Sequence, residues 1–251
     1  MKLLEAEDVS VHYGAYCALD GVTAAMSEGE FVSIIGPNGA GKTTLVNVLT
    51  GLLAPTRGTV RFRGTSIAGR GPVYLSRLGM ARSFQLVNIF PDLSVRETIA
   101  VAVVSRLRRG GTWFRDLRRD RDVGLQVEAT ADLFGLTNRL DERSGSLPQG
   151  DKKLLDVASA FALRPIAILL DEPTSGVSTA EKHHMMELMV AAAKEVGVKC
   201  LIQVEHDMDL VFGYSDRIIA IHQGRVLADT TPDGLRANAS VMATVVGKSA
   251  I

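Results

Sequence analysis

The sequence has few of the features that mark secreted, membrane-spanning or nucleic-acid-binding proteins. Its two cysteines, Cys17 and Cys200, lie far apart without metal-ligand spacing, which argues against a disulfide framework and suits a reducing compartment. The formal net charge is +0, so no basic field favours nucleic acid as a partner. No apolar run approaches the roughly 20 residues that a membrane-spanning helix needs, and the charged N-terminal residues do not resemble a signal peptide. We therefore expect any action at a membrane to go through a partner.

The chain is long enough to bury one sizeable core. It has 251 residues, 46% of them hydrophobic, which is the upper end for a single α/β domain. Apolar strand candidates alternate with helical segments, and this alternation favours a largely parallel sheet with helices on both faces. The strand candidates are residues 31–35, 166–170, 199–205 and 217–222, and the helical candidates are residues 42–53 and 180–196. Two further turn-bounded segments, residues 3–12 and 58–63, indicate an antiparallel sheet near the N-terminus.

The middle of the chain has a different pattern. Between about residues 86 and 161 the strand signal fades, and residues 94–107 and 123–134 have helical patterns. We interpret residues 86–161 as a helical subdomain inserted into an α/β core formed by residues 1–85 and 162–251. An arginine-rich stretch, residues 106–121, is either a solvated helix or loop, or a contact with anionic lipid headgroups.

One segment matches the phosphate-binding pattern G-x-x-x-x-G-K-[ST], with an apolar strand before it and a helix after it. Its glycines let backbone N–H groups point at phosphate oxygens, and the positive end of the following helix faces the same place. Lys42 would neutralise the β- and γ-phosphates of a nucleotide, and the Thr43 hydroxyl would ligate Mg²⁺. The predicted ATP-binding residues of this segment are Gly36, Pro37, Asn38, Gly39, Ala40, Gly41, Lys42, Thr43 and Thr44.

Two adjacent carboxylates form a second element. Residues 166–170 predict a buried strand, and Asp171 and Glu172 follow at its C-terminal end, which is where α/β sheets place their ligands. Asp171 would hold Mg²⁺ directly or through water, and Glu172 would orient and polarise an attacking water. Acidic residues end many strands, but together with the phosphate-binding segment this pair indicates nucleotide hydrolysis.

These motifs and the residues that follow them resemble the ATP-binding cassette (ABC) family over nearly the whole chain. The resemblance implies a P-loop NTPase (RecA-like) α/β core, an N-terminal antiparallel β subdomain and an inserted helical subdomain. Gln85, after Ser83 and Phe84, matches the glutamine that reaches Mg²⁺ and the attacking water. Tyr13 matches the aromatic residue that stacks on adenine, the alternative being a tyrosine of the core. His206 matches the histidine that contacts the γ-phosphate.

The resemblance thus assigns roles to single residues of this chain. The implied catalytic residues are Glu172, His206, Gln85 and Lys42. The implied Mg²⁺ ligands are Thr43, Gln85 and Asp171. Tyr13 joins the phosphate-binding segment as an ATP-binding residue.

The sequence departs from the family in the signature segment, which contacts the ATP of the other chain in a head-to-tail dimer. The family usually has Leu-Ser-Gly-Gly-Gln, whereas this chain has Leu147, Pro148, Gln149, Gly150 and Asp151. Pro148 removes a hydroxyl and a backbone N–H, Gln149 adds a side chain, and Asp151 adds negative charge near phosphate. Ser178 also stands where the family usually has Asp. These changes affect the half-site that the chain lends to its partner, whereas its own half-site is complete.

The C-terminal part narrows the resemblance. Residues 204–210 (VEHDMDL), 215–217 and 222–228 are similar to the ATP-binding subunits of branched-chain amino acid importers and their urea and aromatic-acid relatives. That similarity implies a cytoplasmic ATPase, peripheral on the inner face of the cell membrane, that uses ATP and Mg²⁺. Its implied partners are a second ABC ATPase subunit, transmembrane permease subunits and, through these, a periplasmic or lipid-anchored solute-binding protein, with no nucleic acid.

Two alternatives differ from this importer interpretation. One is a soluble ABC ATPase outside transport, but the chain has neither the long coiled coil of repair members nor the fused second cassette of translation members. The other is an ATP-gated binding module with little turnover, which the altered signature segment favours and Glu172 disfavours. The transported solute, and the choice between a homodimer and a heterodimer, stay open at this stage.

Overall fold

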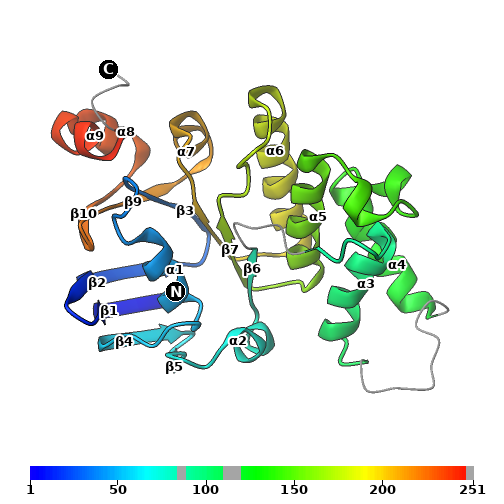
Figure 1. Ribbon diagram of the computed structural model, residues 1–251, viewed down its shortest axis with the longest axis horizontal. Coiled ribbons are helices and arrows are strands. Elements are labelled where there is room, and N and C mark those ends of the chain that lie inside the picture. The colour runs from blue at the N-terminus through cyan, green and yellow to red at the C-terminus, as the bar shows by residue number, and fades with distance from the viewer. Residues whose placement is uncertain (84–88, 110–119, 247–251) are drawn as a thin grey trace. The chain divides into compact units, whose positions relative to one another are not determined.

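The computed structural model (Figure 1) describes residues 1–83, 89–109 and 120–246. The chain divides into two compact units. The first unit joins Met1–Met80 to Lys199–Ile251, and the second is Ala81–Val198. In sequence, the second unit is therefore an insertion into the first.

An antiparallel sheet occupies the N-terminal part of the first unit. It contains β1 (Lys2–Tyr13), β2 (Tyr16–Ser27), β4 (Arg57–Phe62) and β5 (Thr65–Ser66), in the order β2-β1-β4-β5. The predicted antiparallel pairing of residues 3–12 with residues 58–63 is confirmed by the register, in which Leu4 faces Phe62 and Ala6 faces Val60. The sequence did not reveal β2, because its alanines and central Asp-Gly have little β propensity.

The first unit also holds four strands of the mixed sheet, in the order β10 (Arg225–Thr230), β9 (Arg217–His222), β3 (Glu30–Ile35) and β8 (Cys200–Val204). β3 runs parallel to β8 and β9, and β10 is antiparallel to β9. β8 is buried along its whole length and β3 along most of it, which is why both are largely apolar in the sequence. Their buried polar residues bond to each other, because the Gln203 side-chain amide donates to the Ser33 hydroxyl at 2.9 Å. The predicted α/β architecture is confirmed.

The helices of the first unit are α1 (Lys42–Leu49), α2 (Pro72–Leu78), α7 (Met208–Tyr214), α8 (Pro232–Ala237) and α9 (Ala239–Val246). Residues of α7, α8 and α9 pack against β9 in one apolar cluster that includes Val211, Ile218 and Leu235. The expectation that α1 extends to residue 53 is wrong. The helix ends at Leu49, because Gly51 is left-handed with φ 64° and the Thr50 side chain bonds back to the carbonyl of Val46 at 2.7 Å.

The second unit combines two neighbouring strands with a group of helices. The strands are β6 (Met80–Ser83), which begins at the boundary residue, and β7 (Ala167–Asp171). The helices are α3 (Val95–Arg106), α4 (Arg121–Leu133), α5 (Gln149–Ala162) and α6 (Thr179–Val196), with short 3-10 turns at Thr137–Arg139 and Ser144–Ser146.

α3, α4 and α5 pack on one another (Figure 1). The rings of Phe134 and Phe161 contribute to this packing, with centroids 5.3 Å apart. α3 starts with a reciprocal capping box between Ser94 and Glu97, and α4 starts where the Asp120 side chain accepts from backbone N–H groups. Both predicted helices of this region are therefore confirmed. No helix within the described ranges has the length and apolar character to cross a bilayer.

Candidate nucleotide-binding site

The predicted phosphate-binding segment forms a tight loop between β3 and α1 in the first unit. Gly39 and Gly41 have φ of 78° and 105°, a region that L side chains rarely adopt. A Cβ on Gly41 would lie 2.7 Å from the carbonyl oxygen of Ala18, whereas a Cβ on Gly39 would meet no described heavy atom within 4 Å. The loop therefore requires glycine at position 41 for both conformation and space.

The side chain of Lys42 bridges this loop. Its Nζ donates to the carbonyl oxygens of Gly36 at 2.7 Å and Pro37 at 3.0 Å, and the residue is 7% exposed. The ammonium is thus fixed against the loop whose curvature suits phosphate oxygens. Thr43, next to it in the first turn of α1, is exposed. A cation, a hydroxyl and the N-terminal end of a helix together suit a nucleotide polyphosphate with Mg²⁺.

His206 emerges from the same sheet edge as the phosphate loop. Ile34 of β3 pairs in parallel with Val204 of β8, and Gly36 and His206 each follow these residues by two positions. The backbone N–H of His206 donates to the buried carboxylate of Glu205 at 2.8 Å, and the His206 residue itself is exposed. This placement suits the predicted contact with a γ-phosphate, since parallel strands present ligand-binding residues at their carboxyl ends.

Tyr13 closes β1 and pairs with Tyr16 across the β1–β2 hairpin. It is 51% exposed, so the alternative of a core tyrosine is wrong. An exposed ring is what adenine stacking requires, and that role stays a prediction.

The two carboxylates lie in the second unit, where β7 ends. Asp171 is 4% exposed, and its Oδ2 accepts a hydrogen bond from Nη2 of Arg82 on β6 at 2.9 Å. Glu172 has φ 50°, a left-handed conformation that costs a non-glycine residue about 1–2 kcal/mol. Such strain is concentrated at functional sites, which supports a catalytic role for Glu172.

Sequence reasoning missed Arg82, although it directly precedes the Ser83-Phe84-Gln85 segment that was singled out. The available signal was a charged residue between the buried Ala81 and Ser83, because a guanidinium in that setting needs an acidic partner. Gln85 itself lies outside the described residues.

The signature segment is built around the start of α5. Leu147 is buried and anchors the segment, Pro148 is the N-cap without a side-chain capping bond, and Pro148 and Gln149 are both exposed. The carboxylate of Asp151, in the first turn, pairs with Nε of Arg139 at 3.1 Å. The structure thus shows a cation beside the negative charge that the altered signature introduces.

The loop after Glu172 approaches the signature segment. A Cβ on Gly176 would lie 3.9 Å from Cγ of Gln149. Ser178 is the N-cap residue before α6, and its hydroxyl donates a hydrogen bond to the carboxylate of Glu181. At this position, where the family usually has an aspartate, the Ser178 hydroxyl therefore bonds within the first turn of its own helix.

Known proteins match the chain over nearly its whole length. The ABC transporter family matches residues 19–175. The high-affinity branched-chain amino acid transport ATP-binding protein LivG of Escherichia coli (strain K12) is 34% identical over 98% of both chains, and BraF of Pseudomonas aeruginosa has the same identity and coverage. The ADP conformation of MJ1267, an ATP-binding cassette of an ABC transporter, covers 99% of this chain and 100% of its own with TM-score 0.84 and 25% identity. The predicted ATP-binding cassette fold is confirmed, and the chain belongs to the ABC transporter family as an ATP-binding subunit.

Proposed function

We propose that this chain binds Mg-ATP and hydrolyses it to power a membrane importer for branched-chain amino acids, or for a related small polar or aromatic solute. The observation that carries this proposal is the loop between β3 and α1, in which Lys42 Nζ lies 2.7 Å from the Gly36 carbonyl oxygen. His206 emerges from the same sheet edge, after β8. Resemblance to LivG and BraF over 98% of the chain supports the solute class. The subunit would act peripherally on the inner face of the membrane, bound to permease subunits.

The reaction is in-line attack of water on the γ-phosphate, in which catalysis comes mainly from positioning and charge neutralisation. Lys42 neutralises the β- and γ-phosphates, Glu172 orients and polarises the water, and His206 contacts the γ-phosphate. Thr43 and Asp171, with Gln85, would hold Mg²⁺, which supplies positive charge at the phosphate oxygens. Lys42→Ala should lose Mg-ATP binding by calorimetry, and unchanged affinity would contradict the site.

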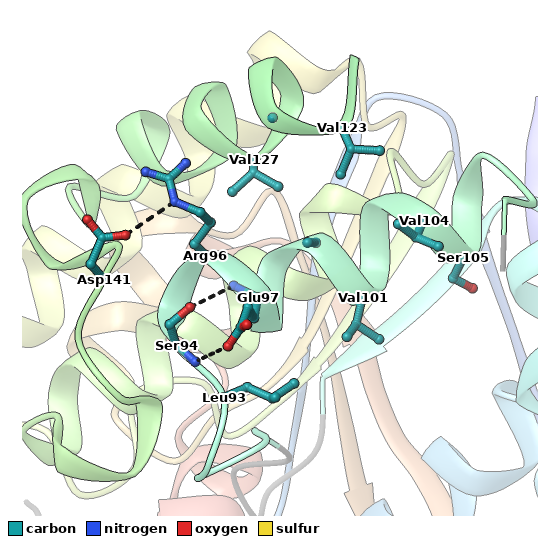
Figure 2. Close-up of a pocket in the computed structure, with 12 residues that line it drawn as sticks. Leu93, Ser94, Arg96, Glu97, Val101, Val104, Ser105, Val123, Val127 and Asp141 are labelled. Atoms are coloured by element: carbon teal, nitrogen blue, oxygen red, sulfur yellow. Dashed lines mark hydrogen bonds and ion pairs between the residues drawn. The ribbon is translucent and has the colours of Figure 1, made fainter. Parts of the chain in front are cut away.

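A groove between α3 and α4 supports coupling to a permease. Its volume is about 820 Å³. Figure 2 shows aliphatic side chains around the capping box of Ser94 and Glu97 and near the Arg96–Asp141 ion pair. Val101 of α3, in the lining, is 45% exposed. The lining includes Leu93, Arg96, Val101, Val104, Val123 and Val127.

This groove suits the short cytoplasmic helix of a permease subunit. An amphipathic helix buries its apolar face in such a groove and meets charged residues at the rim. We assign permease contact to residues 85–96, which begin at Gln85 and include Leu93 and Arg96 of this lining; residues 84–88 lie outside the described ranges. We infer that ATP-driven closure of the dimer moves a permease helix seated here.

We also propose that the functional dimer is a heterodimer with unequal sites. The exposed Pro148 offers neither a hydroxyl nor a backbone N–H to a facing γ-phosphate, whereas the carboxylate of Asp151, in the first turn of α5, is paired with Arg139. A partner with the usual signature would complete a good site on Lys42 and Glu172 of this chain. The site on the partner's phosphate loop would be slower, since losing one hydrogen bond to a charged group is worth about 1.5–3 kcal/mol, or tenfold and more in rate.

The reconstituted complex tests the importer proposal. Permease subunits, both ATPase subunits and the binding protein in liposomes should hydrolyse ATP faster when the binding protein carries leucine, isoleucine or valine. A solute panel with urea and aromatic acids would define the class. An ATP hydrolysis rate that does not depend on the permease or the solute would indicate a soluble ATPase. Nucleotide binding without hydrolysis would indicate an ATP-gated module.

The same complex tests the unequal sites. Glu172→Gln in this chain should remove far more activity than the matching change in the partner, and the isolated chain should hydrolyse ATP slowly. Equal losses from the two changes, or brisk turnover by this chain alone, would refute the heterodimer.

A further inference from the structure

The carboxylate assigned to Mg²⁺ already has a cationic partner in the second unit. Nη2 of Arg82, on β6, lies 2.9 Å from Oδ2 of Asp171, at the end of the neighbouring β7. The two side chains are only 10% and 5% exposed. All of β7 is buried, so Asp171 ends an apolar strand and its charge requires compensation there.

Arg82 and Mg²⁺ would bind the same carboxylate. Whether Mg²⁺ is held by the Asp171 carboxylate directly, at the roughly 2.0–2.1 Å that it keeps to carboxylate oxygens, or through a bound water, two cations beside one carboxylate repel each other. A guanidinium is a permanent cation in proteins. The two cations therefore compete for Asp171.

We propose that Arg82 is a positioning residue that acts as the counterion of Asp171 without metal, and that its guanidinium leaves Oδ2 of Asp171 when Mg-nucleotide binds. The inference rests on the proposed role of Asp171 as a Mg²⁺ ligand. Arg82 sits three residues before Gln85 in the sequence. Its release would thus loosen the link of β6 to β7 just before residues 85–96, to which we assign permease contact.

If Arg82 competes with Mg²⁺, removing Arg82 should strengthen Mg²⁺ binding instead of weakening it. Arg82→Met removes the competing cation, so the purified full-length chain should need less Mg²⁺ for tight ADP binding. We expect the half-saturating Mg²⁺ concentration, from ADP titrations by calorimetry at a series of Mg²⁺ concentrations, to fall about tenfold, the size of one hydrogen bond between charged groups. The melting temperature in EDTA should fall, and Mg-ADP should raise it more in the variant than in the wild type.

A purely structural Arg82 would give a different result, because its loss would lower the melting temperature equally with and without Mg-ADP. Arg217→Met is the matched control, since Arg217 pairs with Asp229 on β10 and touches no residue assigned to nucleotide. It should leave the Mg²⁺ requirement unchanged.

Should Arg82→Met fail to fold, Arg82→Lys replaces it. Lysine keeps the charge but loses the guanidinium fork, so the half-saturating Mg²⁺ concentration should fall about threefold, in line with a weaker competitor. An unchanged or increased Mg²⁺ requirement in the variant that folds overturns the competition. If the ADP affinity of the wild-type chain did not depend on Mg²⁺, the chain would lack the Mg²⁺ site, and that result would contradict the proposed function itself.

Discussion

The phosphate-binding loop allows a stability test that needs no nucleotide. Gly41→Ala places a methyl group 2.7 Å from the carbonyl oxygen of Ala18 and 2.9 Å from Cδ2 of Leu19, at φ 105°. The left-handed backbone costs alanine about 1–2 kcal/mol, and overpacking costs about 1–3 kcal/mol more. We therefore expect Gly41→Ala to lower the free energy of unfolding by about 2–5 kcal/mol.

Gly39→Ala is the matched control in the same loop. Its φ of 78° carries the backbone cost, but its Cβ would meet no described heavy atom within 4 Å, so only about 1–2 kcal/mol is expected. The two variants should differ by about 1–3 kcal/mol, which corresponds to about 2–12 °C in melting temperature for a chain of this size. Thermal unfolding followed by circular dichroism without nucleotide measures both. Equal shifts, or a Gly41→Ala protein as stable as the wild type, would show that the close approach does not constrain this loop.

Three further predictions concern the reaction, the groove and the cysteines. Glu172→Gln should keep ATP affinity within a few-fold while turnover falls about 10²–10⁴-fold, and a rate within about threefold of wild type would exclude the base role. A cysteine at Val101, in the groove, should cross-link to a permease loop. A cysteine at Leu125 should not, because Leu125 is 56% exposed but lies outside the groove lining. Equal cross-linking of the two would contradict docking in the groove. Iodoacetamide at pH 8 should modify the exposed Cys17 but not Cys200 until the chain unfolds. Burial, with a contribution from Glu30, raises the pKa of the Cys200 thiol to about 12, so the reactive thiolate is scarce. Mass spectrometry of the labelled peptides checks this, and modification of Cys200 in the folded chain would contradict it.

The elements that the sequence predicted well are those with a strong local signal. The strand over residues 217–222 was predicted at its observed bounds, because apolar residues run without interruption between charged and turn-forming neighbours. β6 was missed, since four residues with an arginine among them carry no periodic pattern. α1 was extended too far because the apolar residues after Leu49 continue the helical pattern beyond the turn at Gly51.

The residues of the candidate site also differ in how well the sequence alone reveals them. Lys42, Thr43, Asp171 and Glu172 are recognisable because each lies within a short motif. The partners of charged residues are not local: Arg82 is 89 positions from Asp171, and the Arg139 that pairs with Asp151 follows no motif at all. Pairings of this kind depend on which elements the fold places side by side, so they could be read only from the structure.

The left-handed backbone at Glu172 has a consequence for how mutations rank at this position. At most sites glycine is less stable than alanine, because it adds flexibility to the unfolded chain. At φ 50° the order should reverse, and Glu172→Gly should be more stable than Glu172→Ala by about 1 kcal/mol. Random variants selected for thermal stability alone should therefore accumulate glycine at position 172, the residue on which turnover depends. Selection for stability would favour glycine there, whereas selection for transport would keep glutamate.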